Sequence, residues 1–399
     1  MSFESSQTSD KWGVGVEPNF IRGDRMDISA LSARFHVNAE RAVNGTFPVF
    51  EGRVEEKRVL LVSDAVTRRF AEPLLASFQS SGVHAALFSL PEEEPVADEE
   101  TVARVMAAGE GYDYLLAVGS GTMNDLCKRA GFLLHKESGV YATAPSMDGY
   151  TSGVTPLIEK GFKITRGAQT ASDVLMDFSV LKAAPSVMIG AGVGDILAKY
   201  CCLTDWRISR DLKGEKYNEE AASLMYNAVR ASNESLPALF AGKEEGVEKL
   251  MEALLISGYA MVIAGSSRPA SGAEHHMSHF LEMDFLRRGE RIPLHGIKVG
   301  LGTAVSLYLY HTLGSRAGFK GKDVVLKEAE GLPSSEFVLE TLGKLGCPTR
   351  FSELGVSRET VRTMFFEAYK IRDRFTILAL YNEEGLMKDT AEELLEKFY

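Results

Sequence analysis

The first half of the chain alternates between short apolar runs and longer amphipathic stretches. Short apolar runs bounded by turn residues predict buried β-strands, and amphipathic stretches between them predict helices. The predicted strands are KRVLLVSD (57–64), HAALFSL (84–90), YDYLLAVGSGT (112–122), VYATAPS (140–146) and VLMDF (174–178), with helices expected over 66–82, 101–110 and 123–134. Strands that alternate with helices indicate βαβ units, so we expect a Rossmann-like parallel sheet.

The pattern changes near residue 185. Just before it, two roughly alternating apolar runs on either side of Glu159-Lys160-Gly161 predict a β-hairpin. Beyond it, amphipathic helices are predicted over 194–209, 218–233 and 246–265, and further helices continue to Tyr399. We therefore expect an α/β domain over residues 1–185, followed by an all-α domain over residues 186–399.

Composition narrows the class of protein. The chain has 399 residues, of which 45% are hydrophobic and 25% are charged, and its net charge of −11 argues against non-specific nucleic-acid binding. No apolar run reaches the roughly 18 residues that a membrane span needs, and the polar N-terminus does not resemble a secretory signal. The four cysteines (Cys127, Cys201, Cys202 and Cys347) form no C-x-x-C pair. We expect reduced, mostly buried thiols in a cytoplasmic protein.

Histidines cluster in the second half of the chain. Four of the eight, His275, His276, His279 and His295, lie within SGAEHHMSHFLEMDFLRRGERIPLH (271–295). His275 and His279 are four residues apart and share one face of a helix, and neutral imidazole is a common ligand of zinc and similar metals. The alternative is a polar helix face on which histidines gather by accident. His276 points away from its neighbour by roughly 100°, so we expect it to have a packing or supporting role.

A catalytic metal site usually includes a carboxylate, and Asp195 in IGAGVGDILAKY is the best candidate. It follows a glycine-rich stretch that we expect to form a turn before an apolar helix. An Asp at that place also fits a helix N-cap. The residues alone leave both interpretations open.

A glycine turn in the first half fits nucleotide binding. GSGTMND (119–125) follows a predicted strand and opens a helix, where free N–H groups would face a diphosphate. The alternative is an ordinary tight turn, because the full G-x-G-x-x-G pattern is absent. Asp64 ends the first predicted strand, a position that favours the ribose of NAD. Arg68 and Arg69 are close enough to pair with a 2′-phosphate, so NADP stays open as the alternative.

Read together, five motifs resemble the glycerol-1-phosphate dehydrogenases, closest to their bacterial AraM-type branch. These enzymes belong to the superfamily of iron-containing alcohol dehydrogenase, glycerol dehydrogenase and 3-dehydroquinate synthase. The motifs are GSGTMND (119–125), TAPSMDGYTS (143–152), GAGVGDILAK (190–199), SSRPASGAEHHMSH (266–279) and HGIKVGLGT (295–303). They occur in order, within a resemblance that covers residues 40–320.

The resemblance implies a role for each matching residue. Asp195, His275 and His295 would bind a divalent metal ion, zinc or nickel. Asp148, Asp195 and His279 would contact the substrate. The residues implied to line NAD or NADP are Asp64, Gly119, Ser120, Gly121, Thr122, Asp125, Thr143, Ala144, Pro145, Ser146 and Ser152.

The implied activity is metal-dependent interconversion of dihydroxyacetone phosphate and sn-glycerol-1-phosphate, in a homodimer or larger homo-oligomer. Lys199 and Arg268 are candidate phosphate contacts, although Lys199 also fits a surface lysine at the edge of a cleft. Three alternatives are a dehydrogenase of uncharged polyols, a 3-dehydroquinate synthase-like lyase, and a non-catalytic metal or nucleotide sensor. We expect the site between the two domains, where the carboxyl ends of the strands meet the helices.

Overall fold

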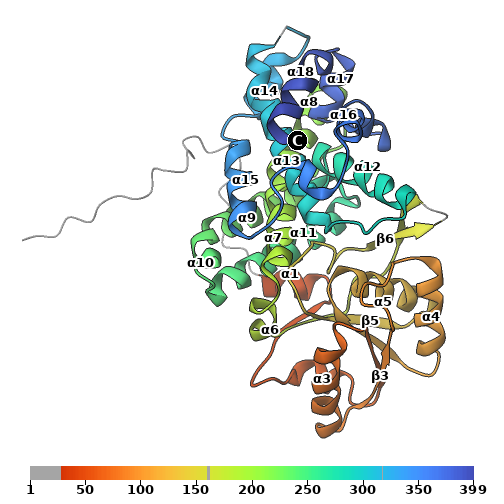
Figure 1. The fold of residues 1–399 in the computed structure, drawn as a ribbon. Helices are drawn as coiled ribbons and strands as arrows, with labels where there is room; N and C mark the ends of the chain where they lie inside the picture. Colours follow the sequence, from red (N-terminus) through yellow and green to blue (C-terminus); the bar gives the residue numbers. More distant parts are fainter. Residues whose placement is uncertain (1–27, 160–161, 317) are drawn as a thin grey trace, which may run out of the picture.

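The computed structural model describes residues 28–159, 162–316 and 318–399. A parallel sheet with its helices forms the lower part of Figure 1, and a larger group of helices forms the upper part. The expected α/β half followed by a helical half is confirmed.

The main sheet has six strands in the order β1-β8-β5-β4-β2-β3, and every neighbouring pair is parallel. Its strands are β1 (Asn38–Arg41), β2 (Arg58–Ser63), β3 (His84–Ser89), β4 (Tyr114–Gly119), β5 (Glu137–Ala142) and β8 (Asp173–Met176). Five were predicted from their apolar runs. The edge strand β1, with the sequence NAER, was not, because it has no apolar run. The carboxylate of Glu40 in β1 accepts hydrogen bonds from the backbone amides of Val49 and Phe50, both at 2.8 Å, and so ties this strand to a neighbouring helix.

Helices cover both faces of this sheet. They are α1 (Ile28–Arg34), α2 (Pro48–Arg53), α3 (Arg68–Ser80), α4 (Glu99–Gly109), α5 (Gly121–Leu134) and α6 (Phe178–Lys182). Successive side chains of β2 point to opposite faces: Val59 and Leu61 join the core under α2 and α3, whereas Leu60 and Val62 join the core under α4 and α5. The second of these cores continues into the helical half.

The predicted hairpin is present as β6 (Val154–Glu159) and β7 (Phe162–Gly167), which pair antiparallel. The two residues of its turn, 160 and 161, lie outside the described residues. The hairpin lies beside the helix that carries the histidine cluster, since the Lys163 ammonium on β7 is 2.7 Å from a Glu282 oxygen on that helix.

The helical half begins at α7. Its α-helices are α7 (Ser186–Leu197), α8 (Lys199–Lys213), α9 (Glu219–Glu234), α10 (Leu236–Phe240), α11 (Glu244–Ala264), α12 (Ala273–Arg288), α13 (His295–Thr312), α14 (Lys322–Glu328), α15 (Ser335–Lys344), α16 (Arg358–Glu367), α17 (Ile377–Glu383) and α18 (Met387–Phe398). Short 3₁₀ helices are η1 (Arg268–Ala270), η2 (Leu313–Ser315), η3 (Phe351–Leu354) and η4 (Ala368–Ile371). The run over Ser186–Lys213 contains an apolar stretch long enough to span a membrane, but 83% of that stretch is buried inside the protein, so α7 and α8 are core helices.

The predicted domain boundary at residue 185 lies between α6 and α7. Contacts nevertheless cross between the halves: Phe35 stacks on Tyr259 of α11 at 5.1 Å, and the Ser32 hydroxyl lies 3.0 Å from the hydroxyl of the same tyrosine. The start of the described chain is therefore anchored on the helical half. The division into two domains stays a prediction.

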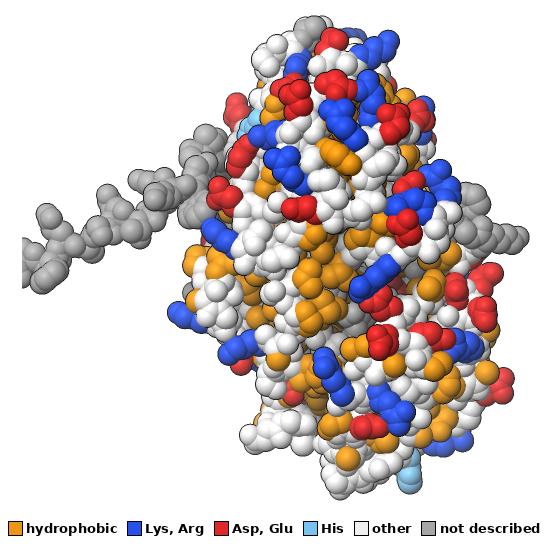
Figure 2. Space-filling view, in the orientation of Figure 1, with side chains coloured by type: hydrophobic (Ala, Val, Ile, Leu, Met, Phe, Trp, Pro, Cys, Tyr) orange, Lys and Arg blue, Asp and Glu red, His pale blue; other side chains and the backbone are white. Residues whose placement is uncertain are grey.

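The surface in Figure 2 shows mixed charge. Lys and Arg side chains alternate with Asp and Glu over the helical half, and apolar side chains gather across the middle of the molecule. The charges on this face are therefore mixed, and no broad field of one sign covers it.

All four cysteines are free and buried.

Candidate active site

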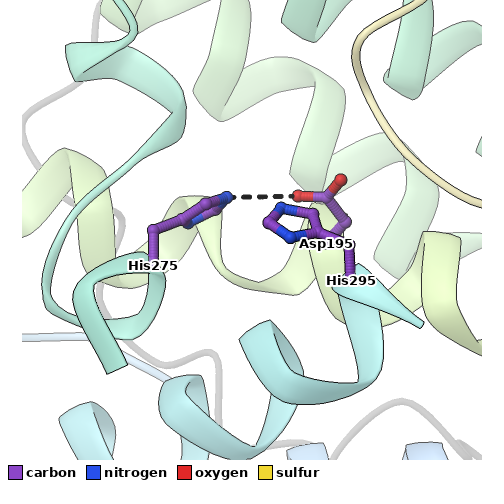
Figure 3. Close-up of side chains that lie close together, drawn as sticks. All are labelled: Asp195, His275 and His295. Carbon is purple, nitrogen blue, oxygen red and sulfur yellow. Dashed lines mark ion pairs between the residues drawn. The ribbon is translucent and has the colours of Figure 1, made fainter. Parts of the chain in front are cut away.

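Three side chains that could hold a metal ion meet between α7, α12 and α13. Asp195 comes from the last turn of α7, His275 from the first turn of α12, and His295 is the first residue of α13. One donor atom of each lies within 4.8 Å of the others. The Nε2 atom of His275 faces Asp195 Oδ1 at 3.7 Å, with the His295 ring beside them (Figure 3). The structure thus brings together the three residues that the resemblance implies as metal ligands.

Glycines allow these helices to approach so closely. A Cβ atom added to Gly194 would lie 2.3 Å from the carbonyl oxygen of Gly296, and one added to Gly296 would lie 1.8 Å from that of Ala191. Helices α7 and α13 therefore touch backbone to backbone, next to Asp195 and His295. A Cβ atom on Gly192 would lie 1.9 Å from the Pro145 carbonyl oxygen, so the loop after β5 is equally close. Any larger residue would push the donors apart.

The same glycines correct one expectation from the sequence. A turn was expected over the glycine-rich stretch, with a helix starting at Gly194 and Asp195 as a possible N-cap. Instead, α7 begins at Ser186 and runs through Gly190, Gly192 and Gly194, so Asp195 lies near its C-terminal end. The N-cap interpretation is wrong. Glycine usually weakens a helix, but here close packing of backbones on the buried faces of α7 requires it.

Carboxylates behind the two imidazoles fix which nitrogen faces the site. Glu274 Oε1 lies 2.9 Å from His275 Nδ1, and Glu282 Oε1 lies 3.1 Å from His295 Nδ1. With Nδ1 turned toward these carboxyl groups, each ring has its Nε2 atom left for a metal ion. Burial, with the nearby Lys199 charge, holds the pKa of His275 well below its usual range, so this imidazole is neutral. Sequence reasoning missed Glu282, although its spacing of three and seven residues from His279 and His275 places it on their helix face.

A buried ammonium joins the carboxylates of Asp148 and Asp195. The Lys199 Nζ atom donates to Asp148 Oδ2 at 2.7 Å, to Asp195 Oδ1 at 2.9 Å and to the Ala270 carbonyl at 3.3 Å. Burial alone would raise the pKa of Asp148, but the Lys199 charge and the hydrogen bonds from Lys199 and Ser257 together outweigh it and lower that pKa. Burial and the Asp148 charge together raise the pKa of Asp195. Ser257 also donates to Asp148 Oδ2 at 2.6 Å.

Both predicted phosphate contacts are engaged elsewhere. Lys199 is fully buried, so the interpretation as a surface lysine is wrong, and its three N–H groups already have acceptors. Arg268 is also buried; its guanidinium pairs with Glu215 at 2.7 Å and donates to the Phe375 carbonyl. Of the Arg268 nitrogens, only Nη1 has no hydrogen-bond partner among the described residues.

The other two histidines of the cluster have different surroundings. The His279 ring lies 6.1 and 6.3 Å from those of His295 and His275, so it borders the donor set without joining it. Its Nδ1 atom is 3.0 Å from Glu282 Oε2, and burial lowers its pKa to about 4. His276 is completely buried, and neither of its ring nitrogens has a partner within the described chain.

The residues implied to bind the nicotinamide cofactor line the carboxyl ends of three adjacent strands, β2, β4 and β5. Asp64 follows β2. The turn from Gly119 to Thr122 joins β4 to α5, and Thr143 to Ser146 follow β5, with the Thr143 amide donating to the Gly119 carbonyl at 3.1 Å. The first amides of α5 have no carbonyl within the helix, so they are available to a phosphate group.

Side chains at the edge of this region are partly occupied. The Asp64 carboxylate accepts from the Thr67 amide at 2.6 Å and from its hydroxyl at 2.8 Å. Arg68 pairs with Glu72, whereas the Arg69 guanidinium lies 4.8 Å from the centre of the Phe70 ring. Between the two arginines, only Arg68 is therefore held by a carboxylate.

Two residues implied to contact the cofactor are buried more deeply. The Ser152 hydroxyl accepts from Lys128 Nζ at 3.1 Å and lies within hydrogen-bond distance of the carbonyls of Gly149 and Val154. The loop around Asp148 is thus fastened to α5. Asp125 on α5 is also buried, one of its oxygens has no partner among the described residues, and burial raises its pKa to about 6.

The fold and the donor set define an enzyme class that combines a nucleotide-binding sheet with a metal centre held by helices. Residues 39–185 match the family model of iron-containing alcohol dehydrogenase. The solved iron-containing alcohol dehydrogenase from Corynebacterium glutamicum superposes with a TM-score of 0.66 at 16% identity, covering 90% of this chain and 94% of that one.

Sequence comparison gives the family within that class. The chain is 36% identical to glycerol-1-phosphate dehydrogenase [NAD(P)+] of Bacillus subtilis, over 83% of this chain and 86% of the relative. It is 37% identical to the enzyme of the same name from Bacillus velezensis, over 82% and 86%. This chain belongs to the glycerol-1-phosphate dehydrogenase family, as the motifs predicted.

Proposed function

We propose that this protein is a metal-dependent sn-glycerol-1-phosphate dehydrogenase that interconverts dihydroxyacetone phosphate and sn-glycerol-1-phosphate with NAD(P)(H). The observation that carries the proposal is the juxtaposition of Asp195, His275 and His295 beside Asp148, in a chain of this family. Three donors leave a coordination position open, and open positions are typical of catalytic sites.

The residues present fit a divalent ion. Imidazole nitrogens and a carboxylate oxygen are donors that zinc and nickel accept, and Glu274 and Glu282 orient the two rings by hydrogen bonds to Nδ1. Asp195, His275 and His295 would hold the ion. When bound, it would supply a Lewis acid for the C2 oxygen of the substrate.

The surrounding side chains would orient the substrate. Asp148 is ionised because Lys199 compensates its charge, so it can accept a hydrogen bond from a substrate hydroxyl. Lys199 itself acts as a positioning residue. His279 is neutral near pH 7 and is held by Glu282 through Nδ1, so its Nε2 atom is the one that can exchange a proton with substrate or water.

The nicotinamide cofactor would lie along the carboxyl ends of β2, β4 and β5. The N-terminus of α5 would bind its diphosphate, and Asp64 would accept from a ribose hydroxyl. The nicotinamide supplies the hydride chemistry, while the protein positions it against C2. The loop with Asp148 connects the two regions, since the Asp148 amide donates to Asp195 Oδ2 at 3.1 Å.

Metal analysis combined with a stereospecific assay tests this function. Purified protein should contain about one equivalent of zinc or nickel, and should oxidise sn-glycerol-1-phosphate much faster than sn-glycerol-3-phosphate or glycerol. Equal turnover of glycerol would instead indicate a general polyol dehydrogenase. Turnover of a dehydroquinate precursor without net NADH would indicate a lyase, and absence of any turnover would indicate a sensor.

We also infer, from the resemblance, a cytoplasmic homodimer or larger closed homo-oligomer. Light scattering across a hundredfold range of protein concentration checks the assembly. A constant monomer mass would contradict it. Cell fractionation checks the location, with activity expected in the soluble fraction.

A further inference from the structure

Three arginines gather beside the histidine helix with only one acidic partner between them. Arg268 pairs with Glu215, but neither Arg372 nor Arg374 forms an ion pair within the described residues. Arg372 reaches the Ser267 hydroxyl at 3.2 Å, and Arg374 reaches the same hydroxyl at 3.0 Å. Two guanidinium charges therefore face one neutral serine. We call Arg372, Arg374 and Ser267 the arginine clamp.

Without a ligand, the arginine clamp is electrostatically unfavourable. Both arginines are largely shielded from water, and burial together with the charges of Arg372 and Arg268 lowers the pKa of Arg374 to about 10. The neighbouring Asp373 is exposed and pairs with neither of them. Because like charges repel and desolvation is unfavourable, two guanidinium groups with no carboxylate at ion-pair distance in the described chain indicate an anionic partner outside it.

Further buried groups around the clamp also lack partners. Arg268 Nη1, the Ser271 hydroxyl and both ring nitrogens of His276 have no hydrogen bond among the described residues. Arg374 Nη1 donates to the Ser271 carbonyl at 3.2 Å. Buried polar groups are normally satisfied, so several unsatisfied groups that can donate to one acceptor-rich ligand point to the same site.

The clamp lies next to the substrate side of the metal donors. Arg372 Nη2 is 3.4 Å from His279 Nε2, the atom proposed to face the substrate. The two arginines also line a surface hollow of about 550 Å³, together with Tyr369, Lys370 and Phe375, which gives them access to solvent. A ligand whose one end lies at Asp195, His275 and His295 would thus place an attached phosphate beside Arg372.

We propose that Arg372 and Arg374, with Ser267, bind the phosphate group of the substrate and so select phosphorylated over unphosphorylated polyols. The inference rests on the proposed function and adds to it the residues that set substrate choice. A phosphate carries close to two negative charges, which match the two uncompensated guanidinium groups, and its oxygens suit the forked donors of arginine.

The test compares two substrates in single variants. Arg372→Ala and Arg374→Ala should each lower kcat/KM for sn-glycerol-1-phosphate by about ten- to a hundredfold, since each removes a charge-assisted contact. Activity on glycerol should change by less than about threefold in Arg374→Ala, because Arg374 contacts Ser267 and Ser271 and not His279. Inorganic phosphate should compete with sn-glycerol-1-phosphate in the unmodified enzyme, with its inhibition constant raised about tenfold or more in each variant.

Lys370→Ala is the matched control. Lys370 lies two residues from Arg372, is exposed, borders the same hollow and pairs with Glu367. Replacing it by Ala removes one positive charge, as replacing either arginine does. It should leave both substrates almost unaffected. Arg372→Lys, which keeps the charge but loses the fork, should retain part of the discrimination.

Each outcome decides between distinct conclusions. If the unmodified enzyme does not prefer sn-glycerol-1-phosphate, the proposed function fails. If it does, but the arginine variants lose both substrates equally or neither, the clamp does not bind the phosphate. Inorganic phosphate that binds without competing would place an anion in the hollow away from the substrate, which also overturns the inference. Metal content and thermal melting confirm that each variant is folded and loaded.

Discussion

The proposed nucleotide region is built mainly from backbone groups, whereas the proposed metal region is built from charged side chains. At the carboxyl ends of β2, β4 and β5, much of the proposed site is backbone; of its outer side chains, Asp64 is half-buried and Arg69 is exposed. Between α7, α12 and α13, charged side chains hold one another in a water-excluded network. The difference teaches where substitutions should be severe. Backbone sites tolerate side-chain changes, whereas a buried charge network fails when one member is removed.

The largest effect is expected at the metal donors. His275→Ala and His295→Ala should each abolish metal binding and lower kcat/KM by at least roughly a thousandfold, because a bound Lewis acid stabilises the charge of the transition state by several kcal/mol. His311→Ala, at the exposed end of α13, is the control and should keep metal and activity. Metal content by mass spectrometry and turnover are measured together. A histidine variant with full metal and normal turnover would remove that residue from the donor set.

The next effect concerns stability of the charge network. Lys199→Met would leave the carboxylates of Asp148 and Asp195 buried without their cation, at a cost of about 3–5 kcal/mol in the free energy of unfolding of metal-free protein. Added zinc should recover much of this loss, because the ion would compensate Asp195. Lys370→Met serves as the exposed control. Denaturant titrations with and without zinc check the prediction. If Lys199→Met lowers the free energy of unfolding equally with and without zinc, the ion and Lys199 do not compensate the same carboxylate charge.

A third prediction concerns pH in metal-free protein. The unfolded imidazole of His279 titrates near 6.5, but burial lowers its folded pKa to about 4. Below pH 6.5 the unfolded state therefore binds more protons, and the free energy of unfolding should fall by about 1.4 kcal/mol per pH unit from this residue until pH 4.

Chemical denaturation at several pH values between 4 and 8 measures this slope. His279→Gln should show a slope smaller by about that amount. His311→Gln, the exposed control, should match the unmodified protein. An unchanged slope in His279→Gln would mean that this imidazole is already charged when folded.

The smallest effect belongs to the nucleotide region. Arg69 has no carboxylate partner in the described chain, so Arg69→Ala should weaken use of NADP by roughly threefold to tenfold and leave NAD unchanged, as expected for one exposed contact to a phosphate. Arg68→Ala, which removes an arginine already paired with Glu72, should have less effect. The KM values for NAD and NADP, measured in both variants and the unmodified enzyme, check the prediction. A variant that loses NAD and NADP equally would place Arg69 away from the 2′-phosphate.

Much of the architecture could be predicted from periodicity. The buried strands read as apolar runs, and the helices read as amphipathic stretches, because local burial leaves a local pattern. Edge strand β1 left no such pattern, and α7 was placed too late because its glycines serve close packing rather than a turn.

Only the site residues that belong to recognisable sequence motifs could be predicted. His275 and Asp195 stand in long motifs, and the structure brings them together. Arg372 and Arg374 stand in the polar segment IRDRF, more than ninety residues after His275, where no spacing links them to the metal region. Lys199 could be interpreted as exposed because its burial depends on Asp148, from a distant loop. Charge compensation among buried groups is a tertiary property that a linear pattern does not record.

The position of the arginine clamp along the chain has a consequence for biosynthesis. Because synthesis proceeds from the N-terminus, a nascent chain contains Asp195, His275 and His295 well before the segment with Arg372 and Arg374 leaves the ribosome. That segment closes onto the earlier helices through the Phe375 carbonyl, which accepts from Arg268, and the Ile377 amide, which donates to Asp205. A chain released before residue 372 would therefore carry the three proposed metal donors but neither arginine of the clamp.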